Sequence, residues 1–324
     1  MPHRRGRVAG ADRGTTAMVL ESTTRRADRH RPLHPAVLGL LIGVGAALVG
    51  LAPWLVSGAR LPLQNLWAAP TTPDDMPRAL LPIGQYHLLT IVGLLVTGGA
   101  AAGTVLRVWI PDRRRTVTGS AVAGLLAVHV AAAAQSLTVA GSGLSAGQTA
   151  RIYLVGILAG VVVTLAAAVV ALLLLSAASR TTAALGVGLV AVPTALWAGE
   201  WALAFAEPFE VPAWVHLAIR WLPAVLVGCA LAWCGLASMR RRAVWLVDLA
   251  LLWLVPPVFD TVRTVVGTRV YLGDPGAMLT LARDALSSSL GPGGGSAATV
   301  ATAVVIAVAG LLVRAALRRR RSST

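Results

Sequence analysis

The sequence has little charge for its length. Only 13% of its 324 residues are charged and 56% are hydrophobic, with a mean hydropathy of +0.74. Soluble globular domains carry about a quarter charged residues, so this composition excludes an ordinary soluble protein. It is typical of a chain that crosses a membrane several times.

Lysine is absent, and all 28 basic residues are arginine. Together with the excess of alanine, glycine and valine, this indicates a bacterial genome rich in G and C, and we expect a multi-pass protein of the bacterial plasma membrane. Cysteine is limited to Cys229 and Cys234. Five positions apart on a helix, these two side chains point in different directions, which excludes a disulfide between them and a CxxC redox motif.

Motifs for nucleotides and metals are also missing. The sequence contains no P-loop and no GxGxxG fingerprint, so direct use of ATP is not expected. The three histidines in or beside apolar stretches, His87, His129 and His216, show no HxxxH or histidine–cysteine spacing. The sequence therefore predicts neither a cofactor nor a metal.

Long apolar runs, by contrast, are abundant. A helix needs about 20 mostly apolar residues to cross a bilayer. Eight stretches approach or reach that length: 36–57, 87–107, 117–139, 152–176, 182–205, 217–238, 243–260 and 297–316. The first is expected to stay in the protein, because the residues before it do not have the composition of a cleavable signal. We predict an all-α integral membrane protein, a polytopic bundle of about eight transmembrane helices with amphipathic segments at its outer face.

The arginines predict how these helices are threaded. If the N-terminus is cytoplasmic, 21 of the 28 arginines fall on the cytoplasmic side and seven on the outer side. Such a bias marks the cytoplasmic side of a membrane protein, so both termini are expected in the cytoplasm. The basic runs would meet anionic lipid headgroups there. Nucleic acid is not expected as a partner, since no soluble domain presents the arginines; a protein partner or soluble subunit is possible.

The predicted domain organisation is a bundle between two basic ends. We expect a disordered arginine-rich tail at 1–34, the transmembrane bundle at 35–316 with outer loops at 58–86, 206–216 and 261–296, and a basic cytoplasmic tail at 317–324. In the third loop, Asp274 is a predicted N-cap and Pro275 the first residue of an amphipathic helix. Only the outer face carries loops long enough to enclose a site.

Three GxxxG pairs predict close contacts between helices. They are Gly39 with Gly43, Gly99 with Gly103, and Gly156 with Gly160. In a membrane, where lipid is as apolar as the helix surface, small residues let two backbones pack closely. We expect a tightly packed bundle.

Four polar residues within the apolar stretches form a candidate intramembrane site: His129, Gln135, Glu200 and Asp248. Polar and ionisable groups at membrane depth are costly and are functional candidates by default. Each also has a structural interpretation. His129, the deepest, could bond a neighbouring helix, Asp248 could pair with an arginine near the inner boundary, and Glu200 could pair with Arg220 or water near the outer boundary.

A second candidate site lies at the predicted outer face. The loop between the fifth and sixth apolar stretches contains Glu207, Glu210 and His216, and His87 begins the second stretch. Paired carboxylates at an outer surface are what general-base or metal-assisted transfer to a lipid-linked substrate would use. No nucleophile with a nearby base accompanies them.

These features leave three functions open. The first is a transport or permease-type component with a site open to the outer face and a path lined by Glu200 and His129. The second is a membrane-embedded enzyme acting on a lipid-linked substrate at the outer leaflet, and the third is a non-catalytic envelope or assembly protein. The missing inverted repeat and the few polar groups in the first, second, fourth and eighth stretches count against a classical secondary transporter, and the missing motif counts against the enzyme. Transport is favoured on base rates alone.

Overall fold

The computed structural model describes residues 34–110, 114–206, 210–268, 274–291 and 296–322. The chain divides after His34, and the described residues from Pro35 onward belong to one compact unit. The predicted tail at 1–34 therefore lies almost entirely outside the described residues, as does Glu207.

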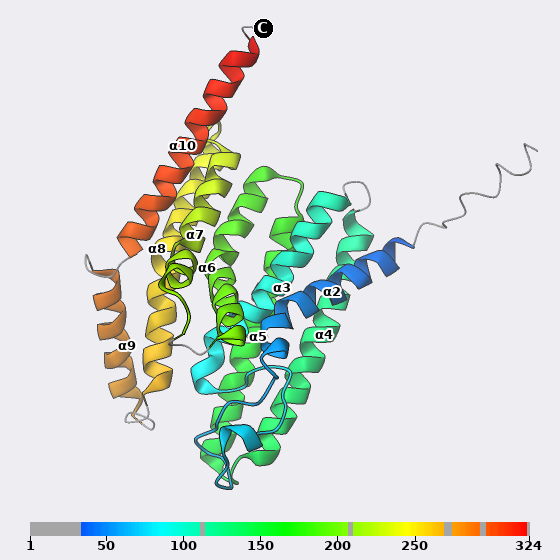
Figure 1. The fold of residues 1–324 in the computed structure, drawn as a ribbon, viewed down its shortest axis with the longest axis vertical. Helices are drawn as coiled ribbons and strands as arrows, with labels where there is room; N and C mark the ends of the chain where they lie inside the picture. Colours follow the sequence, from blue (N-terminus) through cyan, green and yellow to red (C-terminus); the bar gives the residue numbers. More distant parts are fainter. Residues whose placement is uncertain (1–33, 111–113, 207–209, 269–273, 292–295, 323–324) are drawn as a thin grey trace, which may run out of the picture. The chain divides into compact units, whose positions relative to one another are not determined.

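The described residues contain nine α-helices and two short 3₁₀ turns (Figure 1). The helices are α2 (Pro35–Val56), α3 (Leu88–Trp109), α4 (Arg114–Gly143), α5 (Gln148–Ser176), α6 (Arg180–Phe205), α7 (Ala213–Cys234), α8 (Met239–Gly267), α9 (Pro275–Leu290) and α10 (Ser296–Ser322). The 3₁₀ turns are η1 (Pro73–Asp75) and η2 (Gln85–His87). Eight of the helices, all except α9, are long and apolar enough to cross a membrane. The prediction of an all-α, multi-pass membrane protein is confirmed.

The largest difference from the predicted spans is in α8. We expected the shortest span at 243–260, with Asp260 at its end, but α8 has 29 residues and continues to Gly267. At 1.5 Å per residue it is about 43 Å long, more than the hydrocarbon core of a bilayer needs. Asp260 therefore lies within the helix, and α8 packs against α9.

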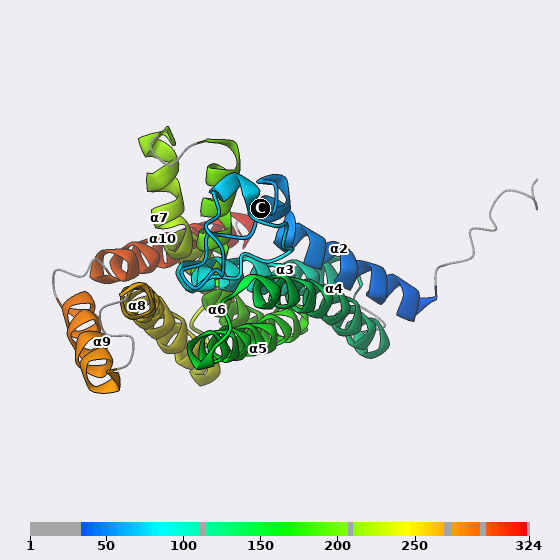
Figure 2. The same ribbon diagram turned by 90° about the horizontal axis from the view of Figure 1, so that it is seen from below.

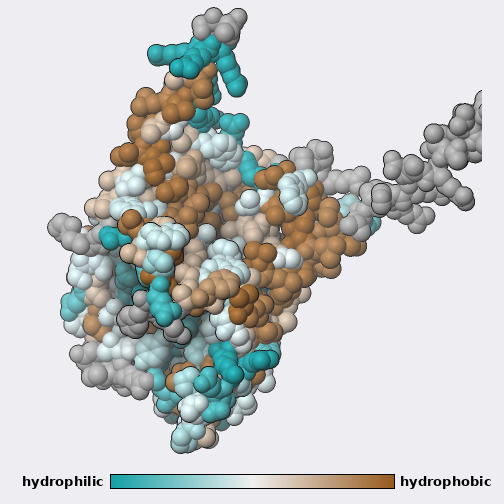
Figure 3. All heavy atoms as spheres, viewed as in Figure 1, coloured by the Kyte–Doolittle hydropathy of each residue, from teal (hydrophilic) through white to brown (hydrophobic). Residues whose placement is uncertain are grey.

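The helices alternate in direction, so their connections gather at two ends of the bundle. We call the end with residues 57–87 the loop face. The other end, which we call the arginine face, carries Arg107, Arg115, Arg180, the run Arg240–Arg242 and the basic end of α10. Figure 3 shows hydrophobic residues over much of the visible side, with hydrophilic residues at the tip of α10 and at the opposite lower end. This distribution fits helices that contact lipid along their length.

The helices α2 to α5 form one closely packed group, which we call the α2–α5 group. Here α2 packs against α4 and α3 against α5 (Figures 1 and 2). A Cβ added to Gly43 would lie 2.0 Å from the carbonyl oxygen of Ala121, and one added to Gly99 would lie 2.1 Å from that of Ala168. Two of the GxxxG pairs therefore mark backbone contacts. The third does not: nothing described lies within 4 Å of a Cβ on Gly156.

The helices α6, α7, α8 and α10 form a second group, which we call the ring. Contacts join α6 to α7, α7 to α10, α10 to α8 and α8 to α6, and α7 also contacts α8 directly. A small apolar core lies inside it, formed by Ala191, Ala224, Val227, Leu231, Leu252, Ala303 and Ala307. Helix α6 also packs against α3 and α5, so it joins the ring to the α2–α5 group.

Two outer segments are built as the sequence suggested only in part. In α9, the Asp274 carboxylate accepts a hydrogen bond from the backbone N–H of Ala277 at 3.0 Å, which confirms the N-cap. The loop at 58–86 contains the 3₁₀ turn η1, which begins at Pro73 after the N-cap Thr72. Leu81 of the same loop is fully buried.

Candidate functional site

The polar residues singled out in the sequence lie at different helix interfaces. His129 lies where α2, α3 and α4 meet, Glu200 between α6 and α3, and Asp248 between α8 and α6. Gln135 contacts the loop that precedes η2. The four residues therefore lie in four separate local environments.

Gln135 anchors the long loop at the loop face. Its side-chain oxygen accepts a hydrogen bond from the backbone N–H of Leu80 at 3.0 Å, and its amide nitrogen donates to the carbonyl of Arg78 at 3.1 Å. The neighbouring Ser136 accepts from the backbone N–H of Leu81 at 2.7 Å. Both residues thus satisfy backbone groups of a loop whose only described regular elements are the short turns η1 and η2.

His129 is fully buried. A Cβ on Gly98 would lie 3.1 Å from its Nε2, so the imidazole fills space that a glycine leaves on α3. Neither ring nitrogen has a hydrogen-bond partner among the described residues. The imidazole nevertheless interacts with the backbone of Ala47 on α2, the kind of contact with a neighbouring helix that the structural interpretation expected.

Glu200 has a defined partner on the neighbouring helix. The Thr90 hydroxyl of α3 donates to its Oε1 at 2.9 Å. One turn earlier, the indole N–H of Trp197 donates to the carbonyl of Gly50 at 3.0 Å. The ion pair with Arg220 that the sequence left open is not formed between these two described residues, because the Arg220 guanidinium lies over the Trp221 ring, 5.7 Å from its centroid.

Asp248 is fully buried, and neither carboxylate oxygen has a hydrogen-bond partner in the described part of the chain. The expected ion pair with an arginine of the run 240–242 is absent from these residues. The carboxylate lies against Gly188 of α6, where a Cβ would come within 2.2 Å of Oδ1. Glycine at 188 therefore makes the space that Asp248 occupies.

The predicted outer-face residues do not assemble into a described site. Glu207 lies outside the described residues, and Glu210 and His216 are exposed. His87 ends η2 half-buried, and its Nδ1 has no hydrogen-bond partner among the described residues. The described ranges also contain no group of three histidine, cysteine or acidic side chains that could hold a metal ion.

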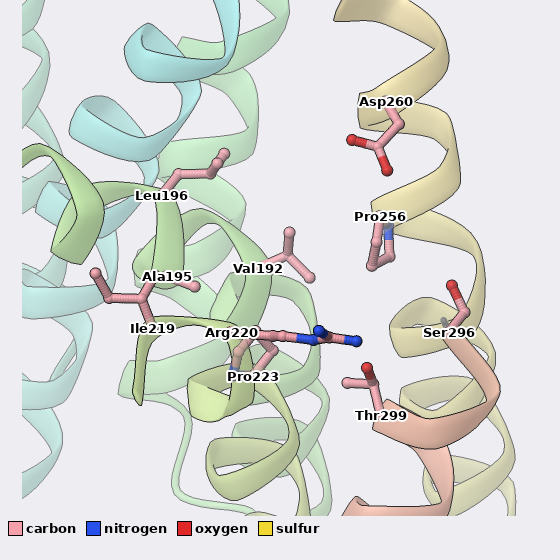
Figure 4. Close-up of a pocket in the computed structure, with 10 residues that line it drawn as sticks. All are labelled: Val192, Ala195, Leu196, Ile219, Arg220, Pro223, Pro256, Asp260, Ser296 and Thr299. Atoms are coloured by element: carbon pink, nitrogen blue, oxygen red, sulfur yellow. The ribbon is translucent and has the colours of Figure 1, made fainter. Parts of the chain in front are cut away.

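A cavity of about 350 Å³ lies inside the ring toward the loop face. Its walls come from α6, α7, α8 and the first turn of α10, and most of the lining is apolar. Figure 4 shows the Arg220 guanidinium extending toward Ser296 and Thr299, and the Asp260 carboxylate turned toward the same space. Both charged residues are exposed, whereas Ser296 is 6% exposed. We call this space the ring cavity.

A second cavity, of about 360 Å³, lies at the arginine face between α7, α8 and α10. It is lined by Cys234 and Gly235 at the end of α7 and by Arg241, Arg314 and Arg318 of α8 and α10. Arg314 also donates to the backbone carbonyls of Ala232, at 2.5 Å, and Trp233, at 2.9 Å. The ring thus has a cavity at each end, and each contains arginine.

Sequence reasoning treated Arg220 and Asp260 as peripheral. The signal that could have identified them is their spacing from the helix ends: each lies seven residues inside its helix, Arg220 after Ala213 and Asp260 before Gly267. Seven residues correspond to about 10 Å of helix. Recognising that depth requires the helix ends, which the apolar runs placed several residues away.

No family model, curated protein or solved structure matches this chain. Its function must therefore be argued from the geometry of the ring and of the α2–α5 group.

Proposed function

We propose that this multi-pass membrane protein is a transport-type protein whose solute path runs through the ring. Three features support a path here. The ring has a cavity at the loop face and another at the arginine face, four of the seven buried residues at its centre are alanines, and one face of α8 connects the two cavities.

The face of α8 carries the proposal. Arg241 lines the cavity at the arginine face, and Pro256 and Asp260 line the ring cavity. Between them, Asp248 and Leu252 are buried against the other helices of the ring. Since these residues are spaced by four or seven positions, they form one continuous stripe on the helix.

The layer between the cavities is rich in alanine. Ala191, Ala224, Ala303 and Ala307 meet there from three helices. Between small side chains, few contacts have to be broken when the helices move. Helix shifts of 1–2 Å are a common means of conformational change. Asp248 lies next to this layer and has no hydrogen-bond partner among the described residues, and intramembrane carboxylates of this kind mark substrate or ion pathways.

Neither Glu200 nor His129 is part of the proposed path. The Thr90 hydroxyl occupies one oxygen of Glu200, and His129 lies within the α2–α5 group next to Gly98. We also propose, from the arginine distribution, that the arginine face is cytoplasmic and that the membrane is a bacterial plasma membrane. No observation favours the enzyme or the assembly protein over transport.

Cysteine accessibility tests the path without knowledge of the cargo. In a variant with Cys229 and Cys234 replaced by alanine, Ala303→Cys and Ala132→Cys place a thiol at buried positions, 0% and 1% exposed. Ala303 lies in the ring and Ala132 in the α2–α5 group. A membrane-impermeant methanethiosulfonate reagent should modify Ala303→Cys much faster than Ala132→Cys, because opening of the path admits water to the ring alone. Equal rates would contradict the path.

A further inference from the structure

The ring cavity contains one positive and one negative side chain that are not paired with each other. Arg220 of α7 and Asp260 of α8 both line it. No ion pair joins these two described side chains, and Figure 4 shows the Arg220 guanidinium directed toward Ser296 and Thr299 and away from Asp260. Two opposite charges facing one cavity without a direct contact leave room for a ligand between them.

We propose that the ring cavity binds a small zwitterion, with Arg220 holding its anionic group and Asp260 its cationic group. As a binding site, this proposal stands on the cavity alone; as an assignment of the cargo, it rests on the proposed transport function.

The chemistry of the lining supports each half of the assignment. A guanidinium presents a planar fork of N–H donors that fits carboxylate, sulfonate or phosphate oxygens. The Ser296 hydroxyl, which can also donate to an anion, lies at the same end of the cavity (Figure 4). Asp260 is the one acidic group of the lining and accepts hydrogen bonds from an ammonium group.

The size and depth of the cavity limit the ligand. A volume of about 350 Å³ is near the lower end of small-molecule sites and holds on the order of ten water molecules at liquid density. The remaining lining, including Val192, Leu196 and Ile219, is apolar. A compact molecule with opposite charges at its two ends and a short apolar middle fits this arrangement.

Either a lone anion or a lone cation would leave one charge of the site without a partner. A zwitterion makes a charge-assisted hydrogen bond to each of the two side chains, and a singly charged analogue to only one, so the site should favour the zwitterion. The same zwitterionic chemistry occurs in free solutes and in the headgroup of phosphatidylethanolamine, and the experiment must separate the two.

Isothermal titration of the purified full-length chain with three matched probes tests the proposal. Taurine carries a sulfonate and an ammonium, ethanesulfonate lacks the ammonium, and ethylammonium lacks the sulfonate. Taurine should bind about tenfold or more tightly than either, since a hydrogen bond to a charged group contributes about that factor. Arg220→Gln and Asp260→Asn should each weaken taurine binding to a similar extent, and Asp260→Asn should leave the affinity for ethanesulfonate unchanged or higher.

Two exposed residues outside the cavity provide controls. Arg263→Gln on α8 and Asp284→Asn on α9 remove the same charges and should leave taurine binding unchanged. Equal binding of taurine and ethanesulfonate, with no effect of Asp260→Asn, would reduce the site to an anion site and overturn the proposal. Absence of taurine binding would overturn it as well.

Nanodiscs distinguish the source of the zwitterion. Taurine binding is measured in discs that contain phosphatidylethanolamine and in discs of phosphatidylglycerol alone. If phosphatidylethanolamine weakens taurine binding, the zwitterion is a lipid headgroup. If taurine binding is equal in both discs, the zwitterion is a free solute. Uptake of radiolabelled taurine into proteoliposomes separates the two proposals. Binding without uptake would contradict transport and keep the site, whereas modification of Ala303→Cys without selective taurine binding would keep the path and remove the zwitterion.

Discussion

The α2–α5 group and the ring are built from similar residues but packed in different ways. Both are rich in alanine, glycine and leucine. The α2–α5 group has one large continuous core, which extends into the loop at 57–87. The ring has a smaller core between its two cavities. Cavities of about 430 and 540 Å³ also lie between α4 and α5 and in the loop at 57–87. The two groups therefore differ in the size of the apolar core and not in the presence of cavities at their ends.

The difference arises from what the small residues face. In the α2–α5 group, Gly43, Gly99 and Gly124 lie against backbone carbonyls of the neighbouring helix. In the ring, Gly188 lies against the Asp248 side chain and Gly310 against the Ala232 side chain, while Gly228 lies against the backbone carbonyl of Ala303. Backbone contacts are thus more frequent in the α2–α5 group, and in the ring glycine also makes room for side chains.

The largest expected effect tests the backbone contacts. Gly43→Ala should lower the free energy of unfolding by about 3 kcal/mol, because the new Cβ would overlap the backbone of α4 and overpacking of this kind costs 1–3 kcal/mol or more. Gly156→Ala, whose Cβ would meet nothing within 4 Å, is the matched control and should be neutral or slightly stabilising. Unfolding in mixed micelles, followed by tryptophan fluorescence, measures both. Equal losses would mean that the α2–α5 group is not closely packed.

The sequence predicted the fold through features that depend on few contacts. Apolar length gives the spans, so all eight were found, although α7 begins at Ala213 and not at 217. Capping chemistry is local, so Asp274 was assigned correctly. Contacts between distant segments were not predictable: the GxxxG pattern of Gly156 and Gly160 has the same spacing as the two genuine contacts, and only the positions of the neighbouring helices separate them.

A second prediction concerns the attachment of the loop to the α2–α5 group. Ser136→Ala should reduce the free energy of unfolding by about 1–3 kcal/mol, because the buried N–H of Leu81 loses its acceptor. It should also increase proteolysis within 57–87. Ser142→Ala is the control: this hydroxyl is exposed and bonds only to the Val139 carbonyl of its own helix. If both variants behave alike, the loop is held by its apolar contacts, including the buried Leu61 and Ile83.

For the candidate site, the sequence identified types of residue but not their partners. Glu200 and Asp248 were both recognised as carboxylates at membrane depth, yet Glu200 bonds to Thr90, which lies 110 positions earlier, and Asp248 is buried without a partner among the described residues. The ring cavity combines Arg220, Asp260 and Ser296 from three helices. No spacing within the sequence encodes that meeting, because it depends on the order of helices around the ring.

The smallest expected effect is an increase in the free energy of unfolding, and it tests why the ring retains Asp248. A buried carboxyl group without a partner costs free energy, so Asp248→Ala should raise the free energy of unfolding by about 1 kcal/mol, which is the lower part of the penalty for an unsatisfied polar group. Ser136→Ala removes a paired polar group of the α2–α5 group and should destabilise.

The same Asp248→Ala variant should lose taurine uptake in proteoliposomes, because Asp248 lies on the proposed path. Functional sites commonly lower stability for the sake of activity, so the gain in stability and the loss of uptake are expected together. Unfolding in mixed micelles and uptake, measured on one preparation, give both results. A loss of stability would show that Asp248 has a partner that holds the ring together. A gain in stability with uptake unchanged would show that the solute path does not depend on this carboxylate, and the stripe on α8 would then be a packing surface between two separate cavities.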